Sequence, residues 1–337
     1  MNLDRFLKYT DRNKNYFITS ESDIKYLMWS SYIEWISILI KNKVINILAN
    51  ILIIDTVKNA TENKYNVLDL WKKGVSKKIF DWIDELIVDP NNTNMADQDF
   101  LIKNWVKKLI SVKELLKPLR SVKSYEEIVK LRKSQEINIK TFEFIQSLIK
   151  PWMTELEIAK LIKIKHLEFW SSWESFEPIV AFGKFSAEAH HVNDNKRKLT
   201  YDDQILIDMW CIFEWYCSDM TRVIFMEKCP QKQIELYESV RKIAYECLKY
   251  WKVWMKYKDL HNKAVELFGV HKKKFTHQLW HWVWIDIHEY PLWMSRIDDV
   301  IKEDEVITIE PWIYFPWKYW FRYEIMAVAK KTWFIEL

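Results

Sequence analysis

Short apolar segments and helical stretches alternate along the first third of the chain. Residues 16–19, 36–40 and 51–55 each have the length and the β-branched or aromatic content of a strand. Strands that alternate with helices are typical of an α/β domain. The pattern changes near residues 116–120, so we predict one domain at residues 1–118 and a second at residues 119–337.

The second domain opens with helices that carry their own start signals. Ser124 with Glu127, and Thr154 with Glu157, have the spacing of a capping box, in which each residue satisfies a backbone N–H near the other. After about residue 175 strands dominate, interrupted by a helix at 231–250 and another after Tyr257. The expected fold class is therefore mixed α/β (α+β).

Charge and cysteine content give little sign of a macromolecular partner. A net charge of +4 is mild, and basic residues are interspersed with acidic ones, so we expect neither nucleic acid nor a membrane as partner. The apolar stretch 36–54 is interrupted by polar residues and indicates buried strands. The N-terminus lacks a signal-peptide pattern and the four cysteines form no CxxC pair, which favours a cytoplasmic protein with reduced thiols.

Two carboxylates form the first candidate for chemistry. An apolar run ends at Asp208, and Asp219 follows in the segment 216–222. The two residues are symmetric about the point between Phe213 and Glu214. If a hairpin turn lies there, the two carboxylates face each other on neighbouring strands. Such a buried pair is costly unless a cation or a shared proton relieves the repulsion.

A second carboxylate pair repeats this arrangement. Glu310 and Glu324 are symmetric about Trp317, where a hairpin turn is expected, and His281 lies between the two pairs in the sequence. One imidazole and four carboxylates suit two divalent ions such as Mn, Co, Fe or Zn. Two ions about 3.5–4 Å apart can share a hydroxide and polarise a carbonyl.

The ratio of tryptophan to glycine is inverted. The chain has 20 Trp and 3 Gly, whereas average usage gives roughly 24 Gly in a chain of this length. Many Trp stand where a turn favours Gly, which adopts positive φ freely. We therefore hypothesise that most Trp are glycines in the natural protein, because a reassigned UGA codon was read as Trp. The alternative is an unusually aromatic protein with a stacking surface. The replacement is expected above all at Trp152, Trp210, Trp215, Trp284, Trp312, Trp317 and Trp320.

With Trp read as Gly, the ordered motifs resemble those of the pita-bread metallopeptidases, and especially aminopeptidase P and prolidase. The motifs are Asp-x-Gly at Asp208, Ser-Asp-x-Thr-Arg around Asp219, His-Gly-x-Gly-x-x-x-His-Glu-x-Pro from His281, Glu-Pro-Gly from Glu310 and Arg-x-Glu ending at Glu324. The resemblance covers nearly the whole chain. It implies a creatinase-like N-terminal α/β domain followed by a pita-bread catalytic domain, and this N-terminal domain favours the Xaa-Pro branch.

The resemblance also implies a role for each ligand. Asp208 would chelate one ion, Asp219 and Glu324 would bridge both, and His281 and Glu310 would complete the other. Manganese is the expected metal, with Co, Zn and Fe as alternatives. A hydroxide shared by the ions would attack the scissile carbonyl, and Glu310 would handle its proton.

Four further residues come from the same resemblance. His288 and His190 would contact the substrate from opposite sides, while His277 and Arg322 would line the proline pocket or brace the site. The stretch between His190 and Asp208 is one residue longer than the family pattern, so His191 remains an alternative to His190.

The implied function is removal of the first residue from peptides whose second residue is Pro, by an enzyme that forms a homodimer. A dipeptidase acting on Xaa-Pro is the main alternative. A binding module without catalysis is a further one, although such relatives lose metal ligands and this chain keeps all five.

Taken alone, an Asp at a strand end more often caps a turn, and an isolated His is more often a core or surface group.

Overall fold

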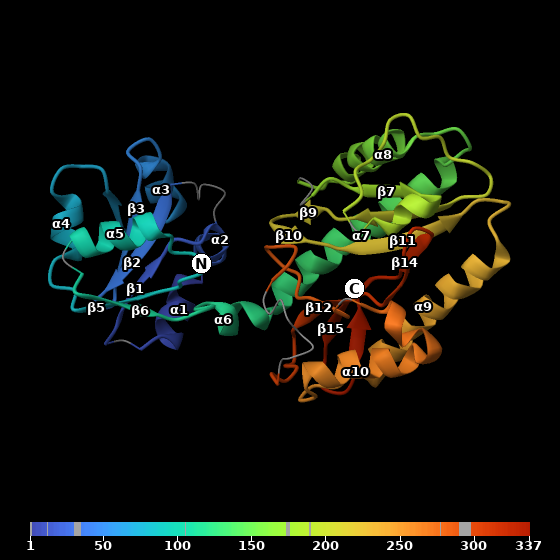
Figure 1. The fold of residues 1–337 in the computed structure, drawn as a ribbon. Helices are drawn as coiled ribbons and strands as arrows, with labels where there is room; N and C mark the ends of the chain where they lie inside the picture. Colours follow the sequence, from blue (N-terminus) through green and yellow to red (C-terminus); the bar gives the residue numbers. More distant parts are fainter. Residues whose placement is uncertain are drawn as a thin grey trace. The chain divides into compact units, whose positions relative to one another are not determined.

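The computed structural model describes residues 2–11, 13–29, 35–104, 106–172, 176–188, 190–276, 278–289 and 298–337. The chain divides into two compact units, Met1–Arg120 and Ser121–Leu337 (Figure 1). Within the described ranges no helix is both long and apolar enough to cross a membrane.

A six-stranded mixed sheet forms the centre of the N-terminal unit, in the order β4-β3-β2-β1-β5-β6. Phe17, Leu39, Phe80 and Leu86 belong to the buried apolar cluster at this sheet. The elements are α1 (Leu3–Tyr9), β1 (Asn15–Ile18), α2 (Glu21–Met28), β2 (Ile36–Lys41), β3 (Val44–Ala49), α3 (Ile54–Ala60), β4 (Asn66–Asp69), α4 (Val75–Phe80), β5 (Glu85–Val88), α5 (Met95–Lys103), β6 (Lys108–Ser111) and α6 (Lys117–Ser121).

Two of the three strands predicted here are confirmed, as β1 and β2, and the third is wrong. Residues 51–53 form a turn, and α3 begins at Ile54. The side chain of Asn50 accepts a hydrogen bond of 2.9 Å from the backbone N–H of Leu52, which closes an Asx turn directly after β3. Leu52 is 77% exposed, so this apolar run does not belong to the sheet.

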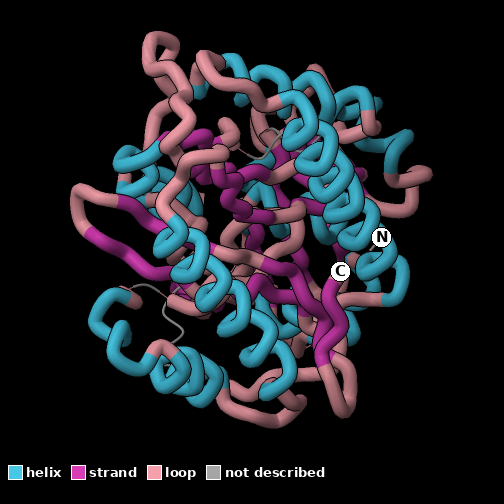
Figure 2. Tube along the Cα trace, turned by 90° about the vertical axis from the view of Figure 1, so that its right-hand side faces the viewer, coloured by secondary structure: helices cyan, strands magenta, loops and turns pink. Residues whose placement is uncertain are grey.

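The C-terminal unit consists of two halves with a similar plan, each with two helices outside a small antiparallel sheet (Figures 1 and 2). In the first half α7 (Tyr125–Leu148) and α8 (Glu155–Glu168) accompany β7 (Ile179–Phe182), β8 (Gln204–Met209) and β11 (Met220–Phe225). In the second half α9 (Gln231–Tyr250) and α10 (Tyr257–Leu267) accompany β12 (Val306–Ile309), β15 (Ile325–Ala329), β16 (Phe334–Glu336) and the hairpin β13 (Trp312–Phe315) with β14 (Tyr319–Arg322). The shorter elements are η1 (Gly183–Ala187), β9 (Ile212–Phe213), β10 (Tyr216–Cys217) and η2 (Gly269–Lys274).

The predicted helices of this unit are confirmed together with their start signals. Ser124 and Thr154 are the N-caps of α7 and α8, and both capping boxes are complete. Helices α9 and α10 begin at the positions that the sequence indicates. The mixed α/β prediction is therefore confirmed.

Tryptophan occupies backbone conformations that normally require glycine. The φ angle is positive at all three Gly and at eight of the Trp that the structure describes, where it lies between 55° and 77°. Side chains with a Cβ atom clash in this region, so Trp there is unusual. The eight positions are Trp29, Trp35, Trp82, Trp152, Trp170, Trp215, Trp254 and Trp317.

Candidate metal centre

The first hairpin brings Asp208 and Asp219 to one face in a register that differs from the predicted one. Strand β8 pairs with β11 so that Thr221, rather than Asp219, lies directly opposite Asp208. The centre of symmetry is one residue further along, between Glu214 and Trp215, because Phe213 pairs with Tyr216. Asp219 precedes Thr221 by two residues and so shares its face, which makes it a diagonal neighbour of Asp208.

The second hairpin has the register that the sequence predicted. Trp312 pairs with Arg322 and Ile309 pairs with Ile325, and both pairs are symmetric about Trp317. Glu310 and Glu324 therefore lie opposite each other where the β13–β14 ladder meets the β12–β15 ladder.

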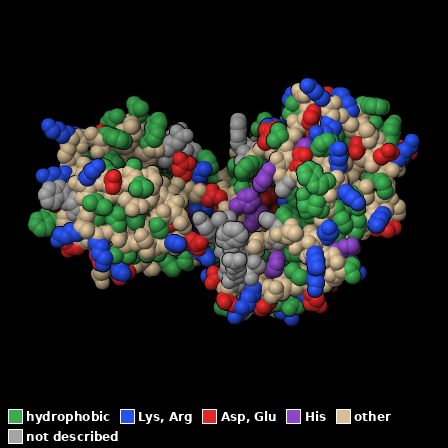
Figure 3. All heavy atoms as spheres, in the orientation of Figure 1, with side chains coloured by type: hydrophobic (Ala, Val, Ile, Leu, Met, Phe, Trp, Pro, Cys, Tyr) green, Lys and Arg blue, Asp and Glu red, His purple; other side chains and the backbone are tan. Residues whose placement is uncertain are grey.

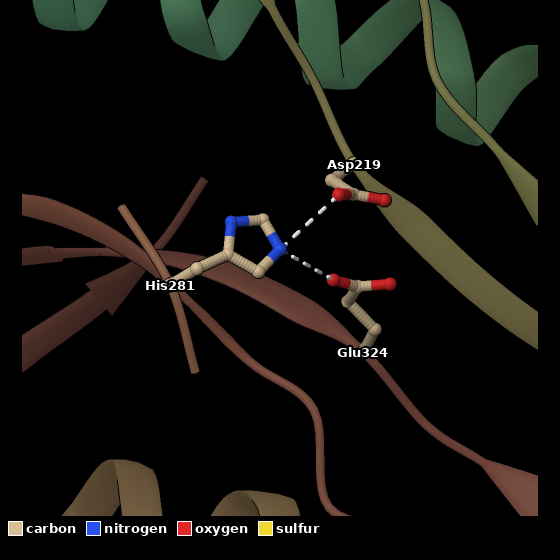
Figure 4. A group of neighbouring side chains, drawn as sticks. All are labelled: Asp219, His281 and Glu324. Atoms are coloured by element: carbon tan, nitrogen blue, oxygen red, sulfur yellow. Dashed lines mark ion pairs between the residues drawn. The ribbon is translucent and has the colours of Figure 1, made fainter. Parts of the chain in front are cut away.

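His281 reaches both carboxylate pairs from a third segment. Its Nδ1 lies 3.1 Å from the carbonyl oxygen of Trp282, which can only accept, so Nδ1 carries the hydrogen. Its Nε2 faces Asp219 Oδ2 at 3.4 Å and one oxygen each of Glu310 and Glu324 at 3.8 Å. Figure 4 shows the ring directed between Asp219 and Glu324. A histidine that ligates a metal typically donates its other ring N–H in this way.

Thr221 and Arg322 link the remaining carboxylates. The Thr221 hydroxyl oxygen lies 2.8 Å from Asp208 Oδ1 and 2.7 Å from Glu324 Oε2. Arg322 forms an ion pair with Asp208 and a second one with Glu310, with Nη1 and Oε2 3.4 Å apart. No role for Thr221 was predicted from the sequence. Its place in the Ser-Asp-x-Thr-Arg motif was the signal that could have indicated one.

Four acidic side chains are fully buried together, and their protonation reflects this crowding. Burial, with the charge of Glu324, raises the pKa of Asp219 well above its ordinary value and that of Glu310 to about 8. Burial also acts to raise the pKa of Glu324, but the charges of Arg322 and His281 and the hydrogen bond from Thr221 outweigh it, so the pKa is about 2. Without a cation, part of the negative charge in this cluster is neutralised by protons.

The residues present fit a metal ion. Asp219 Oδ1 and Glu324 Oε1 are buried carboxylate oxygens without a hydrogen-bond partner, which is rare in a protein interior unless an ion or water satisfies them. Ligand atoms of Asp219, His281 and Glu324 all lie within 4.8 Å of one another. Carboxylate oxygens with one imidazole nitrogen suit Mn, Co, Fe or Zn.

His288 lies beside the cluster, and Glu289 supports its loop. The rings of His288 and His281 have centroids 4.6 Å apart, and the side chain of His288 is exposed. Glu289 is buried and its Oε1 accepts hydrogen bonds from the backbone N–H groups of Ile285 and Asp286, at 3.1 and 3.3 Å. Figure 3 shows histidine side chains next to acidic ones on the visible face of this unit.

The two adjacent histidines differ sharply in environment. His190 is exposed in the turn after η1, whereas His191 is buried between Glu155 and Glu188. His277 lies outside the described residues. The structure thus brings together Asp208, Asp219, His281, Glu310, Arg322 and Glu324, with His288 next to them.

Comparison with known proteins finds relatives of this chain and of its fold. An uncharacterized peptidase of Staphylococcus aureus is 31% identical over 237 residues, which cover 69% of this chain and 67% of the relative. The fold is similar to that of the prolidase from Pyrococcus furiosus (TM-score 0.89, 25% identity, 98% of each chain covered). It is also similar to an X-Pro aminopeptidase from Thermotoga maritima (TM-score 0.88, 23% identity, 99% of this chain and 97% of the other covered). These likenesses identify the mixed α/β architecture as the pita-bread fold. Residues 129–331 match metallopeptidase family M24, and the chain belongs to this family.

Proposed function

We propose that this metallopeptidase hydrolyses the bond between the first residue and Pro at the N-terminus of peptides. The observation that carries the proposal is the buried cluster of His281 with Asp219, Glu310 and Glu324, which the two hairpins bring within 4 Å of one imidazole nitrogen. The likeness to a prolidase and to an X-Pro aminopeptidase supports the choice of Xaa-Pro substrates.

In this proposal Asp208, Asp219, His281, Glu310 and Glu324 hold two divalent ions, with manganese the first candidate and Co, Zn and Fe the alternatives. Bound ions supply an activated water and polarise the scissile carbonyl. Within this chain, Thr221 and Arg322 orient the carboxylates through the hydrogen bonds and ion pairs described above.

Proton transfer and substrate contact are assigned to different residues. We assign the proton of the attacking water to Glu310, a buried carboxyl whose Oε2 lies 3.4 Å from Arg322 Nη1. We assign His288 and His190 to substrate contact, because both side chains are exposed and His288 lies next to His281. His191 is less suited to this task, since both of its ring nitrogens face carboxylates. Arg322 and His277 remain candidates for the proline pocket.

A dipeptidase restricted to Xaa-Pro is the second candidate function, favoured by the likeness to the P. furiosus prolidase. The two functions differ in whether the chain accepts a residue after Pro. We expect the purified protein with manganese to cleave an Xaa-Pro-Yaa peptide at least as fast as the matched Xaa-Pro dipeptide. Cleavage of the dipeptide alone would assign the chain to the dipeptidases, and cleavage of neither would refute the proposal.

A homodimer and a cytoplasmic location complete the proposal. Light scattering of the purified protein and fractionation of the source cells measure them directly.

We also propose that most of the tryptophans are glycines in the natural protein. Support comes from the eight Trp at positive φ and from indole nitrogens that are buried without a hydrogen-bond partner at Trp210, Trp251, Trp280 and Trp320. Peptide mass spectrometry of protein from the source organism should find Gly at Trp317, Trp215 and Trp152. Intact Trp at these positions, or UGG codons there, would refute the proposal.

A further inference from the structure

A buried charged cluster lies at the N-terminus of α8, outside the candidate metal centre. At its centre Glu155 is fully buried. Its Oε1 accepts a hydrogen bond of 2.9 Å from the backbone N–H of Phe182. Its Oε2 accepts from the backbone N–H of Asp194 at 2.9 Å and from Arg197 Nη1 at 2.7 Å. A buried carboxylate with so many donors is well satisfied, and it ties α8 to the end of β7 and to the loop before β8.

His191 belongs to this cluster through both ring nitrogens. Nε2 lies 2.8 Å from Glu155 Oε2, and Nδ1 lies 2.7 Å from Glu188 Oε2. Carboxylate oxygens only accept hydrogen bonds, so both nitrogens carry hydrogen and the ring is an imidazolium. Arg197 Nη1 lies 3.3 Å from Nε2, and the Arg197 guanidinium stacks on Phe185, 3.3 Å from the ring centroid.

The charges around His191 are closer to balance when it is protonated. Glu155, Glu188 and Asp194 contribute three negative charges, and Asp194 Oδ2 lies 3.6 Å from Arg197 Nη2. Arg197 and protonated His191 contribute two positive charges. A neutral His191 would leave Arg197 as the single cation among these five groups and would break one of the two ring contacts.

The same contacts fix the turn that presents His190. The backbone N–H of His191 donates a hydrogen bond of 3.1 Å to the carbonyl oxygen of Glu188, so Glu188 and His191 are joined through both backbone and side chains. His190 precedes His191 directly, and its own side chain is exposed. Its freedom to move is therefore limited by a neighbour that is anchored to the N-terminus of a helix.

We propose that His191, held between Glu155 and Glu188, is a positioning residue that sets the orientation of His190 toward substrate. This inference rests on the proposed function, in which His190 contacts the substrate. Burial acts to lower the pKa of His191, but the hydrogen bonds to Glu155 and Glu188 outweigh it and the pKa is raised above 6.5, so the anchor is in place at neutral pH. At higher pH His191 loses its proton and this anchor is released.

The test compares His191→Gln and Glu188→Gln with the wild-type protein loaded with manganese. Glu188 is 55% exposed at its side chain, so Glu188→Gln should fold normally even where His191→Gln does not. Lys196→Gln, an exposed change in the same loop, is the matched control. For His191→Gln we expect kcat on an Xaa-Pro-Yaa peptide to fall roughly ten- to hundredfold, as displacement of a reacting group by about 1 Å does, while KM and metal content stay unchanged. For Glu188→Gln we expect a smaller fall in kcat. We also expect this variant to lose activity at a lower pH than the wild-type protein does.

A readout independent of activity separates this inference from the proposed function. Histidine ring signals in a proton NMR titration should include one signal with a pKa above 6.5 that is absent from His191→Gln. The signal assigned to His190, by its absence from His190→Gln, should shift in His191→Gln and Glu188→Gln but not in Lys196→Gln. A His190 signal and a kcat that are both unchanged in His191→Gln would overturn the inference, as would a fall in kcat that only follows metal loss. If the wild-type protein cleaves no Xaa-Pro peptide, the proposed function fails and the NMR result alone decides this inference.

Discussion

One hydroxyl and one guanidinium organise the carboxylates of the candidate metal centre. Thr221 has a single proton to donate, yet its oxygen lies within 2.8 Å of both Asp208 and Glu324, and it accepts from Arg322 Nε at 2.5 Å. A hydroxyl in this position holds carboxylates from two different hairpins at a fixed separation. Supporting groups of this kind orient metal ligands and tune metal affinity.

Replacing Thr221 by Val removes this hydroxyl with little change in volume. We expect manganese affinity to fall roughly 10- to 100-fold, because Asp208 and Glu324 lose their shared partner. Thr221→Ser keeps the hydroxyl and is the matched control. Isothermal titration calorimetry measures both, and equal affinity in Thr221→Val and wild type would show that the hydroxyl has no such role.

Asp219→Ala removes a carboxylate that reaches His281 and carries an unsatisfied oxygen. Activity on an Xaa-Pro-Yaa peptide should fall by more than about 100-fold, which is the upper range for groups that only support a ligand. The fold should survive, since the other carboxylates still have partners, and circular dichroism checks this. Turnover close to that of wild type with full metal content would contradict the assignment, and Glu324→Ala is expected to behave in the same way.

At the scale of elements, two antiparallel hairpins carry the acidic candidate ligands. Comparison of the predicted and observed registers shows how much of this arrangement the sequence could predict. The second register followed from symmetry about Trp317, because a tight turn fixes the pairing of both strands. The first predicted register was wrong, because the strand partner of Asp208 is two residues further along than predicted. Glu214 and Trp215 both adopt positive φ, and the centre of the turn therefore lies one residue later than expected. Because side chains alternate with a period of two, the offset left Asp219 on the correct face.

Three features of the structure could not be predicted from the sequence, and each has a physical reason. The apolar run at residues 51–53 looked like a strand because hydrophobicity alone does not reveal the Asx turn at Asn50. The bond between Thr221 and two carboxylates depends on contacts between hairpins about 100 residues apart in the chain, which a local pattern does not contain. The environment of His191 likewise depends on Glu155, 36 residues away.

Trp317→Gly tests the turn of the second hairpin. Trp317 has φ of 62° and is 89% exposed, so its replacement removes backbone strain without loss of core packing. We expect the free energy of unfolding to rise by about 1 kcal/mol. Trp71→Gly is the matched control, because Trp71 is 77% exposed and does not have positive φ. That variant should be neutral or less stable by up to about 1 kcal/mol, since Gly adds entropy to the unfolded chain. If thermal unfolding shows the same change in stability for Trp317→Gly and Trp71→Gly, backbone strain no longer supports Gly at position 317.

The cluster at the start of α8 should make stability depend on pH. The folded-state pKa of Glu155 is lowered, because hydrogen bonds from His191, Phe182 and Asp194 outweigh the burial that acts to raise it. Its contribution is present above pH 4.5 and is lost as pH falls through the folded pKa. The pKa of His191 is raised, so its contribution is complete below pH 6.5 and is lost as pH rises through the folded pKa. The destabilisation by Glu155→Gln, measured by urea unfolding, should therefore be largest near pH 4.5–6.5 and smaller on either side, whereas a constant difference would contradict the linkage.

At the scale of the whole molecule, the C-terminal unit brings its candidate ligands together by joining two halves of similar plan. The first half supplies Asp208 and Asp219 from one hairpin. The second half supplies Glu310 and Glu324 from another hairpin, and His281 from the segment between η2 and β12. The family assignment and the solved structures show the metallopeptidase family and its fold. Its chemical purpose, in our account, is to hold two divalent ions for hydrolysis of Xaa-Pro bonds.

The most direct test of this account is activity on an Xaa-Pro-Yaa peptide measured against metal content determined by elemental analysis. We expect activity to rise with bound metal up to two ions per chain, to vanish on chelation, and to return best with manganese or cobalt. Asp219→Ala should take up less metal under the same conditions. Full activity in protein shown by elemental analysis to be free of metal would contradict the central claim.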